Sequence, residues 1–397
     1  MTRTLRRFCV LLAVAALTPA CSDKEEPGYT PPETAAQPHL MYMPWSGNLT
    51  SYFRTNIEDM ARVVAEGIPA DVRVLVYFME SPDEASLFEL YRRGGRCERL
   101  TLRTYDPAPD FTAAEGIASV LGDVKREAPA LRYSMSIGSH GMAWLPAVSS
   151  VPGRAAAPAR REYWEHAAPD RPLTRWFGGT SPDHRTEIAT LAEALARTGL
   201  HMEYILFDDC YMSSVEVAYE LRGVTDYLIG STSEIMAYGF PYASAGRHML
   251  GEVDYEGICD AFHAFYSTYT YPYGTIGVTR CAGLEKLADI MRRINAAHAF
   301  DPGRLGDLQR LDGYTPTLFF DLGDYVRRLC SDDALLAEFE KQLDATVPWH
   351  RHTEEYYSMA NGVNPIRTFS GITTSDPSAD PEAAIDRQQT AWWRATH

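Results

Sequence analysis

Several familiar signatures are missing from this chain, and each absence argues against a class of protein. No C-x-x-C pair occurs, which argues against zinc ribbons and thioredoxin-like redox chemistry. The net charge of -16 argues against nucleic acids and anionic membranes as partners, because phosphate binding requires basic stripes. The same acidity is compatible with attracting cationic peptides. No internal repeat is evident, and the length suits one sizeable core or a core with a smaller subdomain.

The N-terminus has no apolar run long enough to cross a membrane, but it carries the parts of an export signal. A basic region with three arginines precedes an apolar stretch at 8–17, which is typical of a signal peptide over residues 1–20. The residues from Leu17 to Cys21 resemble a loose bacterial lipobox, with the leucine one position early. This pattern predicts cleavage before Cys21 and a lipid on its sulfur atom.

The segment after Cys21 has the composition of a tether. Residues 22–26 are mostly acidic, and such a run resembles the surface-export signal of Bacteroidetes lipoproteins. Residues 21–38 are rich in proline and are predicted to form a lipid-anchored linker. We therefore expect the protein in the cell envelope, anchored to the outer membrane through its lipid alone and exposed at the surface. The alternative is an ordinary secretory signal cleaved near Ala20.

Five cysteines remain after the signal peptide and Cys21 are set aside: Cys97, Cys210, Cys259, Cys281 and Cys330. An odd number leaves at least one thiol free or paired outside the chain. His350 and His352 would share one face of a strand, a spacing that suits a metal, but no third ligand is evident. We therefore predict no metal site, and the residues indicate no cofactor.

Strand-like and helix-like segments alternate along most of the chain. The pattern predicts helices at 49–65, 113–127, 181–197, 213–222, 255–269 and 284–297, and strands at 40–45, 72–79, 98–104, 202–207, 226–230 and 275–279. This rhythm predicts an α/β fold whose mostly parallel sheet is covered by helices on both faces, at residues 39–300. Residues 301–397 are mainly helical, then strand-like around 366–373, and are predicted to form a smaller C-terminal subdomain.

His140 and Cys210 each follow an apolar run that ends abruptly at polar residues. In an open α/β sheet, chemistry gathers beyond the carboxyl ends of the strands, so neighbouring strands would bring the two side chains together. An imidazole within hydrogen-bond reach can activate a thiol, and the backbone N–H groups of Gly141 and Cys210 suit an oxyanion. The alternative is a buried structural cysteine and an unrelated loop histidine.

The order of these motifs resembles the clostripain family of cysteine peptidases, in the clan of caspases, legumains and gingipains. The chain shares an apolar block with His140-Gly141, a long spacer and a second block with Asp-x-Cys. Further similar pieces are residues 41–43 with Asn48-Leu49, residues 215–221, and residues 233–234 with 239–242. The resemblance spans residues 40 to 330 and implies a caspase-like fold.

The resemblance also implies roles for individual residues. Cys210 would be the nucleophile, His140 the base and general acid, and Gly141 an oxyanion donor. Asp208 would select Arg or Lys in the substrate through a charge-assisted bond, and Glu234 would lie near the substrate cleft. Asp208 as a mere strand-end cap or surface charge is the alternative.

Two departures from the family pattern bear on this transfer of roles. Asp209 stands where a small residue is common, and its charge would raise the pKa of the thiol if the side chain pointed inward. Tyr238 stands where an acidic residue would deepen a basic-specific pocket. The reaction type is therefore more firmly implied than the specificity.

A long segment between the two candidate catalytic residues has neither helical nor strand periodicity. Residues 149–179 are rich in proline and arginine, and loops of this length are usually functional or disordered. Relatives in the clostripain family are made as zymogens and cut in this interval, so we predict self-cleavage after Arg154, Arg160 or Arg161. The alternative is a plain solvated insertion.

Together the motifs predict a lipid-anchored cysteine endopeptidase that acts on polypeptides. Covalent labelling with a peptidyl electrophile would test this prediction. Two alternatives stay open: an amidase or transpeptidase with the same dyad, and a degenerate surface lipoprotein that binds peptides or glycans without catalysis. The resemblance leaves calcium as a candidate ion. The sequence does not identify the natural substrate or the oligomeric state.

Overall fold

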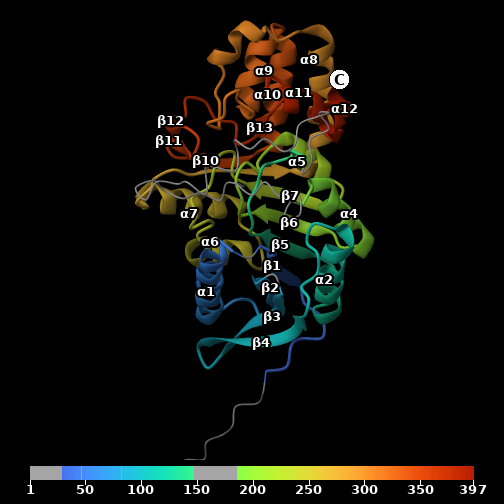
Figure 1. Ribbon diagram of the computed structural model, residues 1–397, viewed down its shortest axis with the longest axis vertical. Helices are drawn as coiled ribbons and strands as arrows, with labels where there is room; N and C mark the ends of the chain where they lie inside the picture. The colour runs from blue at the N-terminus through green and yellow to red at the C-terminus, as the bar shows by residue number, and fades with distance from the viewer. Residues whose placement is uncertain (1–28, 46, 82, 147–185) are drawn as a thin grey trace, which may run out of the picture. The chain divides into compact units, whose positions relative to one another are not determined.

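The computed structural model describes residues 29–45, 47–81, 83–146 and 186–397. These residues form a nine-stranded sheet in the order β10-β8-β7-β6-β5-β1-β2-β3-β4 (Figure 1). Its strands are β1 (Gln37–Met43), β2 (Val72–Ser81), β3 (Glu84–Arg93), β4 (Arg96–Tyr105), β5 (Tyr133–Ile137), β6 (Met202–Phe207), β7 (Thr225–Gly230), β8 (Thr275–Arg280) and β10 (Trp349–His352). The five central strands pair in parallel, and the pairings of the outer strands are antiparallel. The predicted α/β class is confirmed.

Two groups of helices cover the sheet, on opposite sides in Figure 1. One group contains α1 (Thr50–Glu66), α6 (Tyr242–Met249) and α7 (Tyr255–Thr268). The other contains α2 (Ala114–Glu127), α4 (Ile188–Thr198) and α5 (Val215–Leu221). In α1 the buried residues Phe53, Ile57, Met60 and Val64 recur at helical spacing, which gives the helix an apolar stripe against the sheet. Burial on both faces explains why β1 is buried at all seven positions.

The residues after the last predicted helix also contribute to the main sheet. Strand β10 pairs with β8 at one edge, and α8 (Leu284–Ala297), α9 (Leu322–Leu329) and α10 (Asp333–Thr346) share a second apolar core with α5. Smaller elements are β9 (Phe320–Asp321), β11 (Glu355–Ser358), β12 (Gly362–Pro365), β13 (Thr373–Thr374), α11 (Pro381–Asp386) and α12 (Ala391–Thr396). Residues 32–397 form one compact unit.

One local prediction is wrong, and two elements of the main sheet and its covering helices were not predicted. The strand expected around 366–373 is wrong for most of its length, since only Thr373 and Thr374 pair, with β9. Strand β3 was not predicted, because its charged ends and mixed centre show no clear alternation. Helix α6 was not predicted either, because eight residues are too few to show a helical period.

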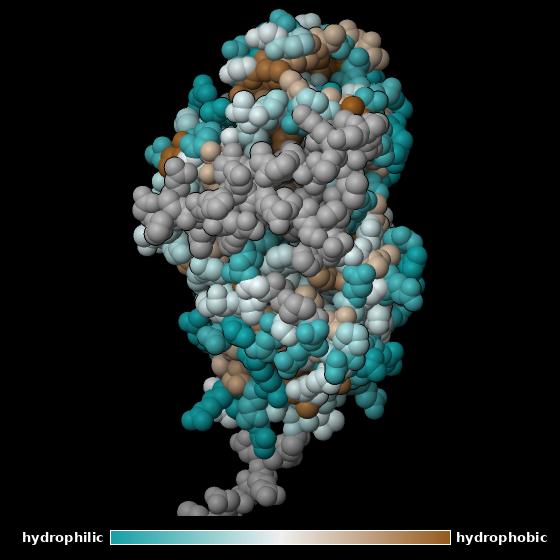
Figure 2. All heavy atoms as spheres, in the orientation of Figure 1, coloured by the Kyte–Doolittle hydropathy of each residue, from teal (hydrophilic) through white to brown (hydrophobic). Residues whose placement is uncertain are grey.

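In the coloured part of the face shown in Figure 2, polar residues predominate, and apolar ones gather at the end that carries α8 to α10 in Figure 1. In the part of the chain that the structure describes, no helix combines the length and the apolarity needed to span a bilayer.

Candidate active site

Adjacent parallel strands carry the two candidate catalytic residues to the same edge of the sheet. Strands β5 and β6 pair in parallel, with Ile137 opposite Phe207 at their carboxyl ends. The N–H group of Asp208 donates to the carbonyl oxygen of Ile137 at 2.8 Å, which ties the start of one loop to the end of the neighbouring strand. His140 and Cys210 each follow within three residues of these strand ends.

Gly141 lies directly against the backbone of Cys210. A Cβ atom added to Gly141 would lie 2.3 Å from the carbonyl oxygen of Cys210 and 3.0 Å from its nitrogen. No side chain fits at that separation, and neither neighbour is a flexible side chain that could move away. The close approach explains the glycine after His140 and brings the two loops into contact.

Asn48 fixes the orientation of the His140 ring. Its Oδ1 atom lies 2.9 Å from Nε1 of Trp45 and 3.1 Å from Nε2 of His140. Because the indole nitrogen can only donate, the shared atom of Asn48 must be an acceptor, and Nε2 of His140 must carry the proton. In a neutral imidazole, Nδ1 is then the basic nitrogen. Trp45 also packs edge-on against the imidazole, with ring centroids 5.4 Å apart.

Cys210 is held in a buried turn. Its Sγ atom accepts a hydrogen bond from the N–H group of Ile235 at 3.3 Å, and its side chain is fully buried. The next residue, Tyr211, has φ of 64°, an uncommon conformation for a side chain of this size and a form of backbone strain often found at functional sites. Stacking of Tyr211 on Phe319, at 4.9 Å between centroids, supports this conformation.

The side chain of Asp209 is turned toward Ser139. Its carboxylate accepts hydrogen bonds from the N–H group of Ser139 at 2.5 Å and from the hydroxyl of Ser139 at 3.2 Å. The charge that would disfavour a thiolate is thereby bound to the loop that carries His140, and the interaction ties this loop to the one that carries Cys210.

Asp208 is buried beside the loop that follows β7. Its Oδ1 atom accepts a hydrogen bond from the N–H group of Phe240 at 2.7 Å. Gly239 allows the tight turn next to it, with φ of 80°. The side-chain amide of Asn56 donates to the carbonyl oxygen of Tyr238 at 3.1 Å, and the Tyr238 hydroxyl donates to Asp59 at 2.6 Å. Asp208 therefore lies against the 238–240 loop, which residues of α1 hold in place.

Glu234 was expected near the substrate cleft. Its carboxylate accepts hydrogen bonds from groups of the protein itself. It accepts hydrogen bonds from the hydroxyls of Tyr211 at 2.8 Å and Ser358 at 2.6 Å, and from the N–H group of Met359 at 3.1 Å. The side chain is almost completely buried. In this position Glu234 joins the turn after Cys210 to the β11–β12 hairpin.

Other predicted positions lie away from His140 and Cys210 or outside the described residues. Cys21, Arg154, Arg160 and Arg161 lie outside the residues that the structure describes. No disulfide joins the described cysteines, and no group of three or more potential metal ligands occurs among the described residues. His350 and His352 lie on β10, where both rings pack against Phe369.

Sequence reasoning missed three side chains at the site. Asn48 was noted only as part of a motif, and neither Asn56 nor Asp59 was considered. The available signal for Asn48 was its place just after a buried strand that, like the strand before His140, ends at the same edge of the sheet. Asn56 and Asp59 lie inside a helical period, where nothing local distinguishes them from surface residues.

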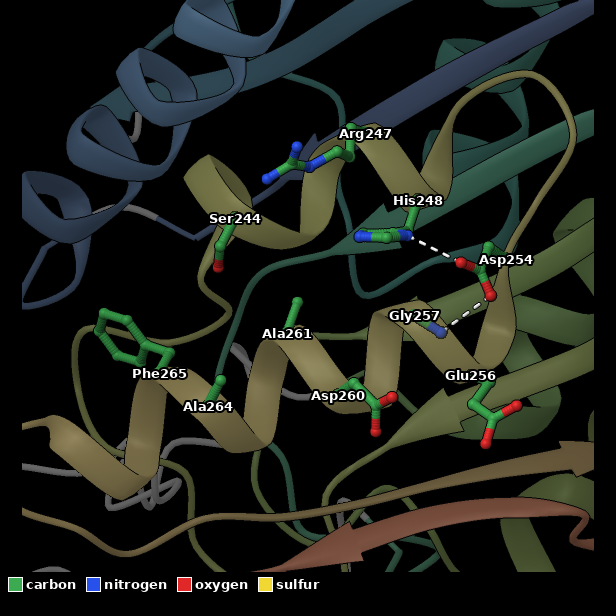
Figure 3. Close-up of a pocket in the computed structure, with 10 residues that line it drawn as sticks. All are labelled: Ser244, Arg247, His248, Asp254, Glu256, Gly257, Asp260, Ala261, Ala264 and Phe265. Carbon is green, nitrogen blue, oxygen red and sulfur yellow. Dashed lines mark hydrogen bonds and ion pairs between the residues drawn. The ribbon is translucent and has the colours of Figure 1, made fainter.

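A cleft of about 680 Å³ lies between α6 and α7 (Figure 3). It is lined by Ser244, Arg247, His248, Asp254, Glu256, Gly257, Asp260, Ala261, Ala264 and Phe265. Four of its ionisable side chains are paired within the protein: His248 contacts Asp254 at 2.9 Å, and Arg351 contacts Glu256 at 3.2 Å and Asp260 at 2.8 Å. None of the candidate catalytic residues lines this cleft.

A thiol and an imidazole at neighbouring strand ends of an α/β sheet are the two groups that a cysteine peptidase needs. Comparison with known proteins identifies the family. Residues 164–298 match the Clostripain family, Peptidase_C11. A secreted C11 cysteine protease from Bacteroides thetaiotaomicron, iotapain, is 50% identical over 92% of this chain and 100% of that chain, with a TM-score of 0.83. The chain belongs to the clostripain family of cysteine proteases.

Two further solved structures are similar. A clostripain from Bacteroides thetaiotaomicron ATCC 29148, in complex with the peptide inhibitor BTN-VLTK-AOMK, is 58% identical over 56% of this chain and 99% of that chain, with a TM-score of 0.55. An inactive zymogen C11 protease from Parabacteroides distasonis is 26% identical over 92% of this chain and 99% of that chain, with a TM-score of 0.75. No curated protein sequence matches the chain.

Proposed function

We propose that Cys210 and His140 form the catalytic dyad of an endopeptidase that cleaves after Arg or Lys. The observation that carries this proposal is the contact between their two loops, in which Gly141 packs on the backbone of Cys210. Family membership favours this function over the amidase, the transpeptidase and the non-catalytic lipoprotein.

The chemistry follows the ordinary course of a thiol protease. Nδ1 of His140 takes the thiol proton of Cys210, and the sulfur atom attacks the peptide carbonyl. The N–H groups of Gly141 and Cys210 donate to the oxyanion of the tetrahedral intermediate. The imidazolium then protonates the leaving amine, a thioester forms, and water activated by His140 releases the acid and restores the thiol. The bond between Asn48 and Nε2 keeps the ring in the required tautomer throughout.

Asp208 is the proposed partner of the substrate cation. A buried carboxylate gains most from a cation when that cation brings its own hydrogen-bond donors, as Arg and Lys do. The peptide of the inhibitor bound to the 58% identical clostripain ends in K, the letter for lysine, which agrees with such a preference.

Self-processing and anchoring complete the proposal. Cleavage after Arg154, Arg160 or Arg161 would follow from the same specificity, and one relative is described as an inactive zymogen. A lipid on Cys21 would hold the domain at the outer membrane through the linker that precedes β1, which begins at Gln37, although one relative is described as secreted. Metabolic labelling with a lipid analogue tests the anchor: label should be present on the wild type and absent from Cys21→Ser. Unlabelled wild type would refute it.

A peptidyl electrophile ending in Arg tests the catalytic proposal. It should label wild-type protein on Cys210, and Cys210→Ala should be neither labelled nor active. Cys259→Ala is the matched control, because that cysteine lies in α7 and should leave labelling unchanged. Cleavage of peptides by Cys210→Ala at the wild-type rate would refute the dyad, and a library profile with no preference for cations would refute the specificity alone. The wild-type ectodomain should appear as two fragments on a denaturing gel, and Cys210→Ala as one.

A further inference from the structure

A ladder of aromatic rings extends from the Asp208 region onto the surface. It contains Tyr238, Phe265, Tyr269 and Tyr271, which we call the aromatic ladder. Tyr238 stacks on Phe265 with centroids 4.8 Å apart and planes at 23°, and Phe265 stacks on Tyr269 at 5.1 Å and 24°. Tyr271 meets Tyr269 edge-on at 6.1 Å.

The first ring of the ladder adjoins the proposed specificity pocket. The side-chain amide of Asn56 donates to the carbonyl oxygens of both Tyr238 and Phe240, at 3.1 Å and 3.4 Å, and so holds this loop in place. Two residues after Tyr238 in the same loop, the N–H group of Phe240 donates to Asp208. The ladder thus begins where the substrate cation is expected to bind.

The last ring of the ladder lies at the surface. Tyr271 is 37% exposed, one of four large apolar side chains that are exposed in the described residues. Tyr238, Phe265 and Tyr269 are half-buried. Phe265 also forms one end of the cleft between α6 and α7, where its ring projects from α7 in Figure 3.

Contacts within the protein hold the first three rings of the ladder in place. Phe265 and Tyr269 are four residues apart at the end of α7, which places them on one side of the helix. The Tyr238 hydroxyl is bound to Asp59, and the neighbouring Tyr266 hydroxyl donates to Gly239 at 2.7 Å. Rings that are already ordered lose little conformational entropy on binding, which is why tyrosines are common in recognition surfaces.

We propose that the aromatic ladder is a second substrate subsite, which binds an apolar or planar side chain next to the cationic residue of the polypeptide. This inference rests on the proposed function, because Asp208 supplies the reference point. Packing of α7 alone explains the buried faces of Phe265 and Tyr269, but it does not require an exposed ring at the end of the stack. Side chains of the peptide residues that flank the cation would pack against this exposed ring.

Two sets of peptides test the proposal. All are quenched fluorescent peptides that contain one Arg. One set varies the residue before the Arg and the other varies the residue after it, among Gly, Asp, Leu and Tyr. Wild type should cleave the Tyr or Leu peptide faster than the Gly peptide at one flanking position. Replacing Tyr271 or Tyr269 by alanine should reduce this kcat/KM ratio by roughly two- to tenfold, the worth of an aromatic contact.

Conservative and distant variants serve as controls. Tyr269→Phe and Tyr271→Phe keep the rings and should keep the ratio. Tyr91→Ala removes a partly exposed tyrosine from β3, which lies near the edge of the sheet opposite to β8 and β10. This variant should change neither the ratio nor the activity. An unchanged ratio in both alanine variants, or a wild type indifferent to its flanking residues, would overturn the subsite.

Binding to the Cys210→Ala chain separates this inference from the proposed function. The same peptides, measured by fluorescence polarisation, should bind more tightly with Tyr or Leu than with Gly beside the Arg, and Tyr271→Ala should remove the difference. A wild type without turnover whose Cys210→Ala form retains this difference would refute the peptidase and support the subsite. Turnover with Arg preference but no flanking effect in either assay would refute the subsite alone.

Discussion

Replacing Asn48 by alanine tests whether the orientation of His140 depends on a single side chain. The substitution removes the acceptor 3.1 Å from Nε2 of His140, and Trp45 loses the same partner. Hydrogen bonds to a group that becomes charged contribute about 1.5–3 kcal/mol, and His140 becomes an imidazolium in the proposed mechanism. The expected loss in kcat is therefore roughly ten- to a hundredfold.

The measurement should separate orientation from substrate binding. Asn48→Ala should lower kcat with little change in KM, and should slow inactivation by an Arg-ending peptidyl electrophile in the same proportion. Asn295→Ala, which removes an amide bonded to Thr396 in the C-terminal helix, is the matched control and should retain wild-type kinetics. Wild-type kcat in a folded Asn48→Ala variant would show that Asn48 does not orient the base.

Three further predictions follow from the same structure. Gly141→Ala should abolish most turnover and labelling, since its Cβ would meet the Cys210 carbonyl oxygen at 2.3 Å; full activity would show that the loops can separate freely. Asp208→Ala should lower kcat/KM for Arg peptides by at least tenfold more than for neutral ones, and an equal loss would exclude Asp208 from specificity. Burial and the Asp376 carboxyl raise the pKa of Glu216 from 4.5 to about 7, so the free energy of unfolding should fall as the pH rises between those values. Melting curves of Glu216→Gln over this pH range should show a smaller fall than those of the wild type. The same fall in both proteins would contradict this prediction.

The direction of the Glu216 effect follows from proton binding. The folded protein retains the Glu216 proton to a higher pH than the unfolded chain does, so deprotonation favours unfolding as the pH rises through this range. Glutamine suits the site because its oxygen can accept from the N–H group of Ser375 while its amide donates to the Ser214 hydroxyl.

Much of the fold was predictable because helices and strands have local periods. The helix predicted at 284–297 matches α8 at both ends, and the strand predicted at 202–207 matches β6. Strand order was predictable only in part. Alternating strands and helices indicate a parallel centre, but they do not indicate that β8 would pair antiparallel with β7. The antiparallel pairings of β3, β4 and β10 depend on hairpins and on a distant segment.

The sequence by itself determined where reactive side chains follow strands, since apolar runs and glycines beside His140 are local features. It could not determine which distant side chains meet them. Asn48 lies 92 residues from His140, and Glu234 lies 124 residues from Ser358, so only the packed sheet brings these partners together. The reason is physical: a local period records which face of an element is buried, whereas a contact across the sheet depends on the order and register of all its strands.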